Sequence, residues 1–293
     1  MLKLPSFAKI NWTLRVAGRR PDGYHEVATV LQTVSLCDEL IFALRDDGEI
    51  LLECDDPSIP VDESNLIVKA ARALSKTRGA DIKLCKKIPA KGGLGGGSSN
   101  AAITLLALNA LWRLGLGEKH LRQIGSELGA DVPFFLIGGT ASATGTGTTL
   151  YELPDTPKCW LLVVTPNASV STATAYNALK APSLTTVDSV SILSSSFTEP
   201  FSGDCSQWPL HNDFEGVIFE IEAEIRRAKL ALLNAGARAA LLAGSGSSVF
   251  GIFNDRAARD QALGNLRCEA GWRVFPCHTL SRSEYCQATD TGA

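Results

Sequence analysis

The sequence has no long apolar run and little net charge. None of its hydrophobic stretches approaches the roughly 18 apolar residues of a membrane-spanning helix, and its N-terminus lacks the apolar core of a signal peptide. Lys and Arg number 28 against 31 Asp and Glu, a formal net charge of −3, which argues against a mainly electrostatic nucleic-acid binder. We therefore expect a cytoplasmic protein that binds neither membranes nor nucleic acid.

The cysteine and histidine spacings of metal and disulfide frameworks are also missing. The eight cysteines include no C-x-x-C pair, and some, such as Cys85 and Cys159, lie inside apolar runs. The four histidines are dispersed along the chain without metal-ligand spacing. We expect reduced cysteines and neither a structural zinc site nor a disulfide framework.

The length and composition predict a globular protein with a substantial core. A chain of 293 residues with 45% hydrophobic residues corresponds to one large or two medium domains, and no internal repeat is evident. The composition changes near residues 154–157. This change predicts an N-terminal domain over residues 1–155 and a C-terminal domain over residues 156–286, followed by a disordered tail at 287–293.

Residues 89–102 are the most distinctive stretch of the chain. Five glycines fall within six positions and are followed by three N-cap candidates and an apolar run at helical spacing. A flexible loop that leads into a helix N-terminus offers unpaired N–H groups and a positive dipole end, so it predicts a phosphate site. The alternative is a mobile linker. The glycines and the N-cap candidates are Gly92, Gly93, Gly95, Gly96, Gly97, Ser98, Ser99 and Asn100.

The surroundings of this stretch suit a phosphate loop of an unusual kind. A predicted strand at 82–88 delivers the chain into the loop, and a predicted helix follows. The loop is not a Walker A loop, because no Gly-Lys-Ser/Thr ends it, and it does not match G-x-G-x-x-G. A second glycine turn, at 244–248, separates two predicted strands within residues 239–253.

The remaining pattern alternates strands and helices. Strands are predicted at 1–16, 27–34, 40–44, 50–54, 159–165 and 272–277, and helices at 65–76, 118–128, 171–180, 211–234 and 255–266. Residues 183–206, rich in Ser, Thr and Pro, predict a surface excursion. Periodicity alone places Lys9 and Asn11 on the solvated side of the first strand, and Asp131 fits an N-cap or a turn.

Three separated segments together resemble the motifs of the GHMP kinases. They are Ala-Lys-Ile-Asn at 8–11 with Pro-Asp-Gly-Tyr-His at 21–25, Gly-Leu-Gly-Gly-Gly-Ser-Ser-Asn-Ala-Ala at 93–102, and Gly-Ser-Gly-Ser-Ser at 244–248. The first segment is similar to that of the members that phosphorylate 4-diphosphocytidyl-2-C-methyl-D-erythritol. Gly-Ala-Asp-Val-Pro at 129–133 and Asn-Asp-Phe-Glu at 212–215 are similar to further segments of those members.

The resemblance implies a two-domain α+β fold and a reaction. The N-terminal domain would be like domain 2 of ribosomal protein S5, with a left-handed βαβ crossover, and the C-terminal domain would be ferredoxin-like. ATP and the substrate would meet between them. The γ-phosphoryl group of ATP would pass to the 2-hydroxyl of the methylerythritol unit in the non-mevalonate route to isoprenoid precursors.

The resemblance also implies roles for particular residues. Asp131 would be the catalytic base that accepts the hydroxyl proton, and Lys9 would orient that hydroxyl and stabilise the developing negative charge. ATP would be held by the two glycine segments, which comprise Pro89, Ala90, Lys91, Gly92, Gly93, Leu94, Gly95, Gly96, Gly97, Ser98, Ser99, Asn100, Gly244, Ser245 and Gly246.

The cytidine substrate would be held by a separate set of side chains. Tyr24 and Tyr176 would stack on the cytosine, and His25 would read its edge, since stacking alone does not select one base. Asn11 would hold the methylerythritol end, and Thr172 would also bind the substrate. An ordinary packing role is the alternative for Tyr176.

Some features depart from the family pattern or leave a role open. Lys91-Gly92 stands where small residues are common, so Lys91 adds a cation near the phosphates or points to solvent. Ser247-Ser248 replaces a frequent Ala-Cys. ATP chemistry implies Mg²⁺, for which Ser98 or Ser99 is a candidate contact. The alternative functions are another GHMP small-molecule kinase and a nucleotide-binding regulator without catalysis.

Overall fold

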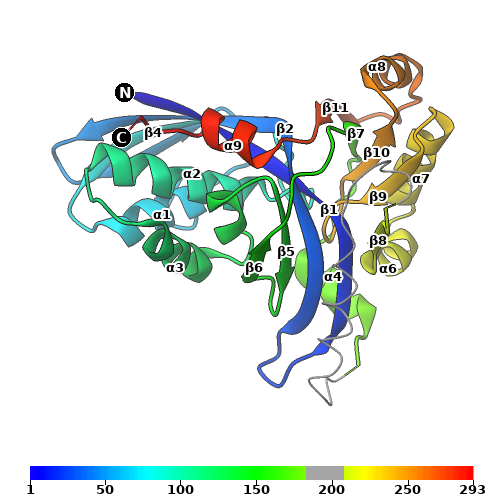
Figure 1. Cartoon of the computed structure of the whole chain (residues 1–293), viewed down its shortest axis with the longest axis horizontal. Helices are drawn as coiled ribbons and strands as arrows, with labels where there is room; N and C mark the ends of the chain where they lie inside the picture. Colours follow the sequence, from blue (N-terminus) through cyan, green and yellow to red (C-terminus); the bar gives the residue numbers. More distant parts are fainter. Residues whose placement is uncertain (183–207, 293) are drawn as a thin grey trace.

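The computed structural model describes residues 1–182 and 208–292. In this part of the chain two β-sheets lie side by side, with helices packed on each of them (Figure 1). The first sheet takes its strands mainly from the N-terminal half, and the second takes its strands from the C-terminal half. The excursion expected at 183–206 lies outside the described residues.

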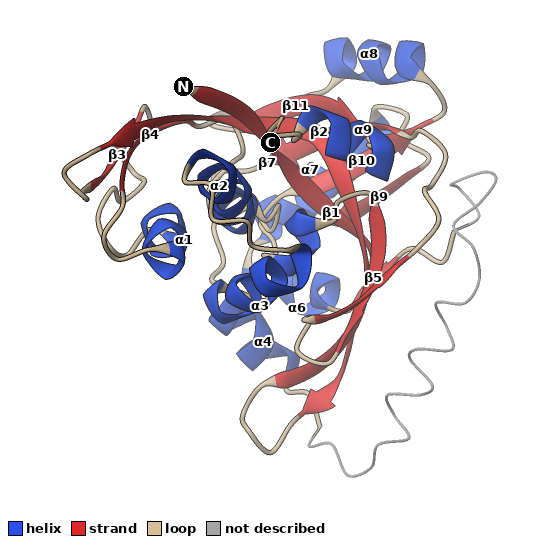
Figure 2. Ribbon diagram, turned by 60° about the vertical axis from the view of Figure 1, so that its left-hand side comes forward, coloured by secondary structure: helices blue, strands red, loops and turns tan. Residues whose placement is uncertain are grey.

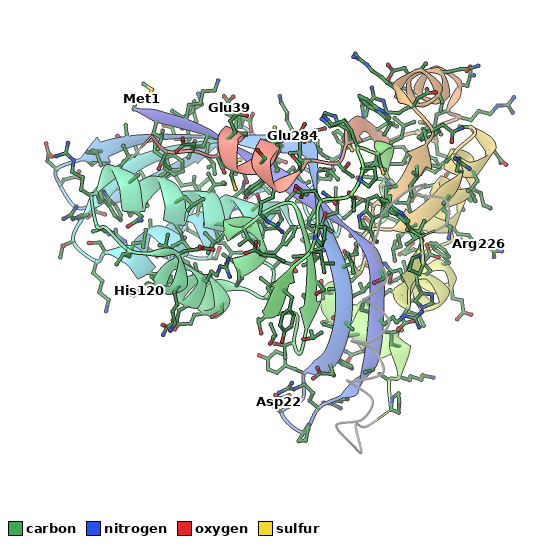
Figure 3. All side chains as sticks on the ribbon, viewed as in Figure 1. Met1, Asp22, Glu39, His120, Arg226 and Glu284 are labelled. Atoms are coloured by element: carbon green, nitrogen blue, oxygen red, sulfur yellow. The ribbon has the colours of Figure 1, made fainter. Side chains whose placement is uncertain are left out.

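A long hairpin forms the backbone of the first sheet. Strand β1 (Leu2–Arg19) pairs antiparallel with β2 (His25–Arg45) over nearly their whole length. The hairpin projects beyond the rest of the sheet, and Asp22 marks its tip in Figure 3. We expected two strands within residues 27–44, but β2 is one continuous strand. Hydrogen bonding to β1 on one edge continues across the polar residues between the two apolar runs.

The other edge of β2 serves two partners. Its C-terminal half pairs with β4 (Gly79–Cys85), which lies parallel to β3 (Ile50–Cys54). Its N-terminal half pairs with β5 (Thr140–Thr144), which continues to β6 (Thr149–Glu152). The two-residue β8 (His211–Asn212) pairs with β1 on the far side. The first sheet is therefore forked around one long strand.

Helices cover one face of this sheet (Figure 2). They are α1 (Leu66–Leu74), α2 (Gly96–Leu111), α3 (Glu118–Leu128) and the short 3-10 helix η1 (Pro133–Leu136). Helix α2 is central: its residues Ala101 to Leu105 and Ala107 to Leu108 are buried among β-strands and the other helices. The expectation that residues 98–100 cap this helix was wrong, because α2 begins at Gly96 after the left-handed Gly95.

The second sheet has the order β11-β7-β10-β9, with all neighbours antiparallel. Its strands are β7 (Trp160–Thr165), β9 (Ala239–Leu242), β10 (Val249–Phe253) and β11 (Arg273–His278). Together with the crossing helices, this order is the ferredoxin-like arrangement that the family resemblance implies. The helices are α4 (Thr172–Leu179), α6 (Phe214–Ile221), α7 (Ala223–Asn234) and α8 (Arg256–Asn265).

The single long helix expected at 211–234 is wrong. His211 and Asn212 form β8, and Glu222, with φ −133° and ψ 89°, separates α6 from α7. Ile218, Ile225, Ala228 and Leu232 are nevertheless buried. The apolar periodicity therefore identifies the inward face of α7 correctly. It fails for α6, where Ile221, expected to face inward, is exposed, and it does not reveal the break.

The two sheets share a core. Ile10 and Trp12 of β1 pack in one apolar cluster with Leu161, Val163 and Phe250 of the second sheet. The Trp12 and Phe250 rings meet edge to face at a centroid distance of 5.9 Å. Because this cluster spans both sheets, it fixes their relative position. We propose that the domain boundary lies at 155/156, in the connection between β6 and β7.

The C-terminal segment returns to the first sheet. Helix α9 (Arg282–Ala288) places the Tyr285 ring against Gly138, and the Tyr285 hydroxyl donates to the Phe135 carbonyl. The prediction that residues from 287 onward are disordered was therefore wrong at its start. Helix α9 includes Ala288, and Thr289 is buried. Within the described ranges, no helix combines the length and apolar character needed to cross a membrane.

Candidate active site

Lys9 and Asp131 come together although 122 positions separate them. Lys9 Nζ lies 3.5 Å from Asp131 Oδ2. Lys9 belongs to β1 and is 5% exposed, whereas Asp131 lies in the turn between α3 and η1 with about a third of its side chain exposed. The placement of Lys9 and Asn11 on the solvated side of the strand was therefore wrong, because both residues are buried. Asp131 does lie in a turn, but its carboxylate also faces a cation.

A chain of hydrogen bonds holds the Lys9 ammonium in place. Lys9 Nζ donates to Asn11 Oδ1 (2.9 Å), and Asn11 Nδ2 donates to Thr29 Oγ1 (2.7 Å). The Thr29 hydroxyl in turn donates to the Thr13 carbonyl (2.6 Å). Since a hydroxyl has one proton, Thr29 accepts from the Asn11 amide, which fixes the amide oxygen toward Lys9. Asn11, expected to contact substrate, therefore holds Lys9 with its carbonyl oxygen.

The Lys9–Asp131 pair lines a pocket of about 730 Å³. The pocket extends between the β1–β2 hairpin, the N-terminus of α2, helix α4 and the loop before β10. Of the predicted substrate residues, all five line it: Asn11, Tyr24, His25, Thr172 and Tyr176. Gly244 and Ser245 of the second glycine turn line the same pocket.

The two glycine segments pack directly on each other. We call them the first glycine loop (residues 89–95) and the second glycine loop (residues 243–248). A Cβ on Gly93, which has φ 74°, would lie 1.9 Å from the Ala243 carbonyl oxygen. Ser248 N donates to the Gly92 carbonyl at 3.1 Å. Close backbone approach therefore requires glycine here, independently of any ligand.

A second pocket, of about 360 Å³, lies along the first glycine loop. It is lined by every residue from Pro89 to Ser98 and by Asn100, and it meets the larger pocket at Gly93, Gly95 and Ser98. Ser99 and Gly246, both expected to bind ATP, line neither pocket. The buried Ser99 hydroxyl accepts from Ser6, and Gly246 packs against Leu242.

Helix α2 presents its N-terminus to both pockets. Its N-cap, Gly95, has no side chain to satisfy the first-turn N–H groups, and Gly96, Gly97 and Ser98 lie on the pocket walls. Uncapped N–H groups and the positive end of the helix dipole together favour an anion. The Asn100 side chain is already used, because it donates to Ser6 and Asp38.

Aromatic side chains also line the larger pocket. The His25 ring stacks on Tyr176 with a centroid distance of 4.7 Å, and the Tyr176 ring meets Phe214 edge-on. Tyr24, at the hairpin, is 67% exposed. Burial, assisted by the charge of Arg19, lowers the pKa of His25, which favours its neutral form. Burial, reinforced by the Asp131 carboxylate, raises the pKa of Tyr176 to about 12.

Comparison with known proteins identifies the family. The models of the GHMP kinases N terminal domain and the GHMP kinases C terminal domain match residues 65–139 and 203–271. A 4-diphosphocytidyl-2-C-methyl-D-erythritol kinase from Pelobacter propionicus is 42% identical over 286 residues, covering 95% of this chain and 99% of the relative. The chain belongs to the GHMP kinases.

Further similar proteins belong to the same family. A protein of the same name from Pseudomonas savastanoi pv. phaseolicola is 46% identical over 265 residues, 89% of this chain and 86% of that protein. A crystal structure of 4-(cytidine 5'-diphospho)-2C-methyl-D-erythritol kinase matches with a TM-score of 0.75 and 33% identity, covering 95% of this chain and 99% of that one. A homoserine kinase from Cytophaga hutchinsonii, 19% identical with a TM-score of 0.69, shares the fold.

Asp38 is a site residue that sequence reasoning missed. Its fully buried carboxylate accepts from the backbone N–H groups of Lys87 and Ile88, both at 2.8 Å, and from Lys86 Nζ at 2.7 Å. The same carboxylate accepts from Asn100 at 3.0 Å. It thus ties β2 to the segment that precedes the first glycine loop and to helix α2, which follows the loop. An acidic residue in an apolar strand is the only signal the sequence carries.

Asn212 holds the second glycine loop in place. Its amide donates to the carbonyls of Leu242 (2.9 Å) and Gly244 (2.8 Å), and its oxygen accepts from Phe214 N. The neighbouring Asp213 accepts from Val16 N at 2.7 Å. The sequence marks this segment only by its family resemblance, because its bonds depend on tertiary contacts.

An apolar wall of the smaller pocket was also missed. Ile59, Pro60 and Leu66 line it together with the glycine loop, and Asn65, which also lines it, caps α1. No motif marks these residues. Their position depends on how α1 packs against α2, which periodicity does not reveal.

Proposed function

We infer that this protein is an ATP-dependent kinase that phosphorylates the 2-hydroxyl of 4-diphosphocytidyl-2-C-methyl-D-erythritol, giving the 2-phosphate and ADP. The observation that carries the proposal is the Lys9–Asp131 pair in the larger pocket, beside an uncapped helix N-terminus. Relatives that match this chain over nearly its whole length bear the name of this activity. The reaction belongs to the non-mevalonate route of isoprenoid precursor synthesis.

The two joined pockets support a defined placement of ATP. The smaller pocket has the apolar wall of Ile59, Pro60 and Leu66, which suits a purine base. The phosphates would then follow the first glycine loop toward Gly95 and Ser98, where the pockets meet. The γ-phosphoryl group would thereby reach the α2 N-terminus beside Lys9 and Asp131.

The larger pocket would hold the acceptor. Tyr24 and Tyr176 would contact the cytosine, and the neutral His25 can donate from one ring nitrogen and accept at the other. Because His25 already covers part of Tyr176, the cytosine would share that face with the imidazole. Thr172, whose hydroxyl lies 3.1 Å from that of Ser245, would position the diphosphate linker near the second glycine loop.

Proton transfer and charge stabilisation are assigned to separate groups. The Asp131 carboxylate would accept the proton of the 2-hydroxyl as its oxygen attacks the γ-phosphorus. The Lys9 ammonium, held by Asn11, would stabilise negative charge on that oxygen. A loose phosphoryl-transfer transition state needs chiefly alignment and neutralisation of charge, which this arrangement supplies.

Mg²⁺ accompanies ATP in our proposal. The described residues contain no cluster of three or more His, Cys, Asp or Glu that could hold a metal ion alone. Magnesium bound to phosphates needs only one or two protein oxygens, and the rest of its shell is water. Ser98 and Asp131 fit that need, whereas the Ser99 hydroxyl is committed to Ser6. Bound Mg²⁺ would neutralise phosphate charge.

A substrate panel tests the proposal. The purified protein is given ATP and Mg²⁺ with the diphosphocytidyl substrate, mevalonate or homoserine, and ADP release and the phosphorylated product are followed. We expect turnover with the diphosphocytidyl substrate alone. Turnover with mevalonate or homoserine only would establish another small-molecule kinase, and ATP binding without any turnover would establish a regulator; either result would overturn the proposal.

A further inference from the structure

Lys91 is the one charged residue of the first glycine loop, and the contacts described so far give its side chain no role. It has φ 56°, in the left-handed region that non-glycine residues seldom occupy, and its side chain is exposed on the wall of the smaller pocket. Glycine would adopt this conformation without steric cost, and the loop uses glycine at the next two positions. The backbone alone therefore does not explain a lysine here.

The second glycine loop fixes the backbone that carries this side chain. The Lys91 carbonyl accepts from Ser247 N at 3.4 Å, and the Gly92 carbonyl accepts from Ser248 N at 3.1 Å. A Cβ on Gly92 would lie only 2.5 Å from Ser248 Oγ. The loop therefore cannot shift by one residue to place a glycine at the left-handed position, and the Lys91 Cβ direction is set.

The other lysines that line the two pockets already have partners. Lys86 Nζ donates to Asp38 and to the Ile88 carbonyl, and Lys9 Nζ is held by Asn11 and Asp131. Among the described residues that line the pockets, Lys91 is the lysine whose ammonium has no carboxylate, carbonyl or ring partner. It is thus the cation that remains available to a ligand.

We propose that the Lys91 ammonium binds a phosphate oxygen of the nucleotide in the smaller pocket. Backbone N–H groups offer ATP only partial positive charge, whereas a lysine supplies a full point charge to a phosphate. Lys91 lines the smaller pocket and not the larger one, so its ligand is the nucleotide rather than the diphosphate of the cytidine substrate. This inference rests on the ATP-binding function proposed above.

Nucleotide binding by substituted proteins tests this role. Lys91→Met removes the charge, Lys91→Gly removes it while favouring the left-handed backbone, and Lys91→Arg keeps it. Lys87→Met is the matched control, because Lys87 is exposed, lies four residues away and lines neither pocket. Calorimetry measures the Kd of ATP, ADP and adenosine for each protein, and steady-state kinetics measure the two KM values.

We expect Lys91→Met and Lys91→Gly to raise the Kd of ATP and ADP about three- to fivefold, the size expected for one exposed ion pair. Adenosine binding and the KM of the cytidine substrate would stay within twofold, as would every constant of Lys91→Arg and Lys87→Met. The unfolding temperature of Lys91→Gly would equal or exceed that of the wild type.

Two results would overturn the inference. If Lys91→Gly binds ATP as tightly as the wild type does, the Lys91 side chain has no role in binding. If Lys91→Met raises the Kd of ATP and of adenosine equally, the substitution acts through the structure of the loop and not through the phosphates. If the wild type phosphorylates the diphosphocytidyl substrate while these results are found, only the Lys91 role fails. If the wild type binds no ATP, the proposed function fails with it.

Discussion

At the scale of single residues, the candidate site depends on how side chains are held rather than on which side chains are present. The Lys9 ammonium is positioned by Asn11, and Asn11 is oriented by Thr29. Each link is a buried hydrogen bond, so the loss of one leaves a polar group without its partner. Residues that do not touch substrate should therefore affect turnover.

Thr29→Val tests this chain of hydrogen bonds. The substitution keeps the shape of the side chain but removes the acceptor of the Asn11 amide, so Lys9 should lose its fixed position. We expect kcat to fall about tenfold, the effect of losing about 1.4 kcal/mol, with the KM of ATP unchanged. Steady-state kinetics measure both constants.

Thr13→Val is the matched control. Thr13 lies on the adjacent strand, and its buried hydroxyl has no hydrogen-bond partner among the described residues. Removing that hydroxyl should leave kcat within twofold and should not lower the free energy of unfolding. Equal kcat values for Thr29→Val and the wild type would contradict the positioning role of Asn11.

His25 predicts a pH dependence of substrate binding. Its pKa is lowered by burial and by Arg19, so the neutral ring persists to lower pH than in a free histidine. Protonation adds a second donor and removes the acceptor that would read cytosine. The KM of the cytidine substrate should therefore rise as the pH falls through this lowered pKa, while the KM of ATP stays flat.

A non-titrating variant identifies the group responsible for this rise. His25→Gln should show a higher KM for the cytidine substrate at every pH, without an acid-side increase. The same acid-side increase in His25→Gln and the wild type would assign the effect to another group.

At the scale of elements, the contact between the two glycine loops decides where the phosphates bind. Gly93→Ala places a methyl group where the Ala243 carbonyl oxygen lies, 1.9 Å away. Either loop must then move. We expect unfolding stability to fall by about 1–3 kcal/mol and the KM of ATP to rise more than tenfold. Chemical denaturation and kinetics measure the two effects.

Gly264→Ala serves as the control for this substitution. Gly264 lies in α8, and a Cβ there meets nothing within 4 Å. Alanine should raise stability by about 0.5–1 kcal/mol through its helix propensity and leave the kinetics unchanged. A Gly93→Ala protein that matched the wild type in both measurements would show that the loops do not need this close approach.

Much of this element-scale organisation could be predicted from sequence. Strands such as β1, β3 and β7 follow from alternation or apolar runs, and the ferredoxin-like order follows from the family resemblance. The break at Glu222 could not be predicted, since the apolar period continues through it. The role of Asp38 could not be predicted either, because its partners lie 48 to 62 positions away.

At the scale of the whole molecule, the C-terminal helix α9 follows the last strand of the second sheet and packs back on the side of the first. Tyr285 of α9 packs against Gly138 and donates to the Phe135 carbonyl in η1, the turn that follows Asp131. Arg282 N donates to Asp155 at 2.8 Å. Both contacts lie on the opposite side of the molecule from the hairpin tip, as Glu284 and Asp22 show in Figure 3. We infer that α9 stabilises η1, and with it the turn that carries Asp131, from outside the pocket.

Tyr285→Phe tests this support. The substitution keeps the buried ring and leaves the Phe135 carbonyl without its donor, so unfolding stability should fall by about 1–2 kcal/mol. Because the ring still fills its place, kcat should change less than threefold. Chemical denaturation measures the first effect, and a stability equal to that of the wild type would contradict it.

The central claim is that Asp131 accepts the proton of the substrate hydroxyl while the glycine loops hold ATP. Asp131→Asn, measured for single turnover of the diphosphocytidyl substrate and for ATP affinity, tests it most directly. We expect the rate of phosphoryl transfer to fall by about 10²–10⁴-fold, the usual contribution of a general base, while the Kd of ATP changes less than threefold. A transfer rate within tenfold of the wild type would contradict the assigned base.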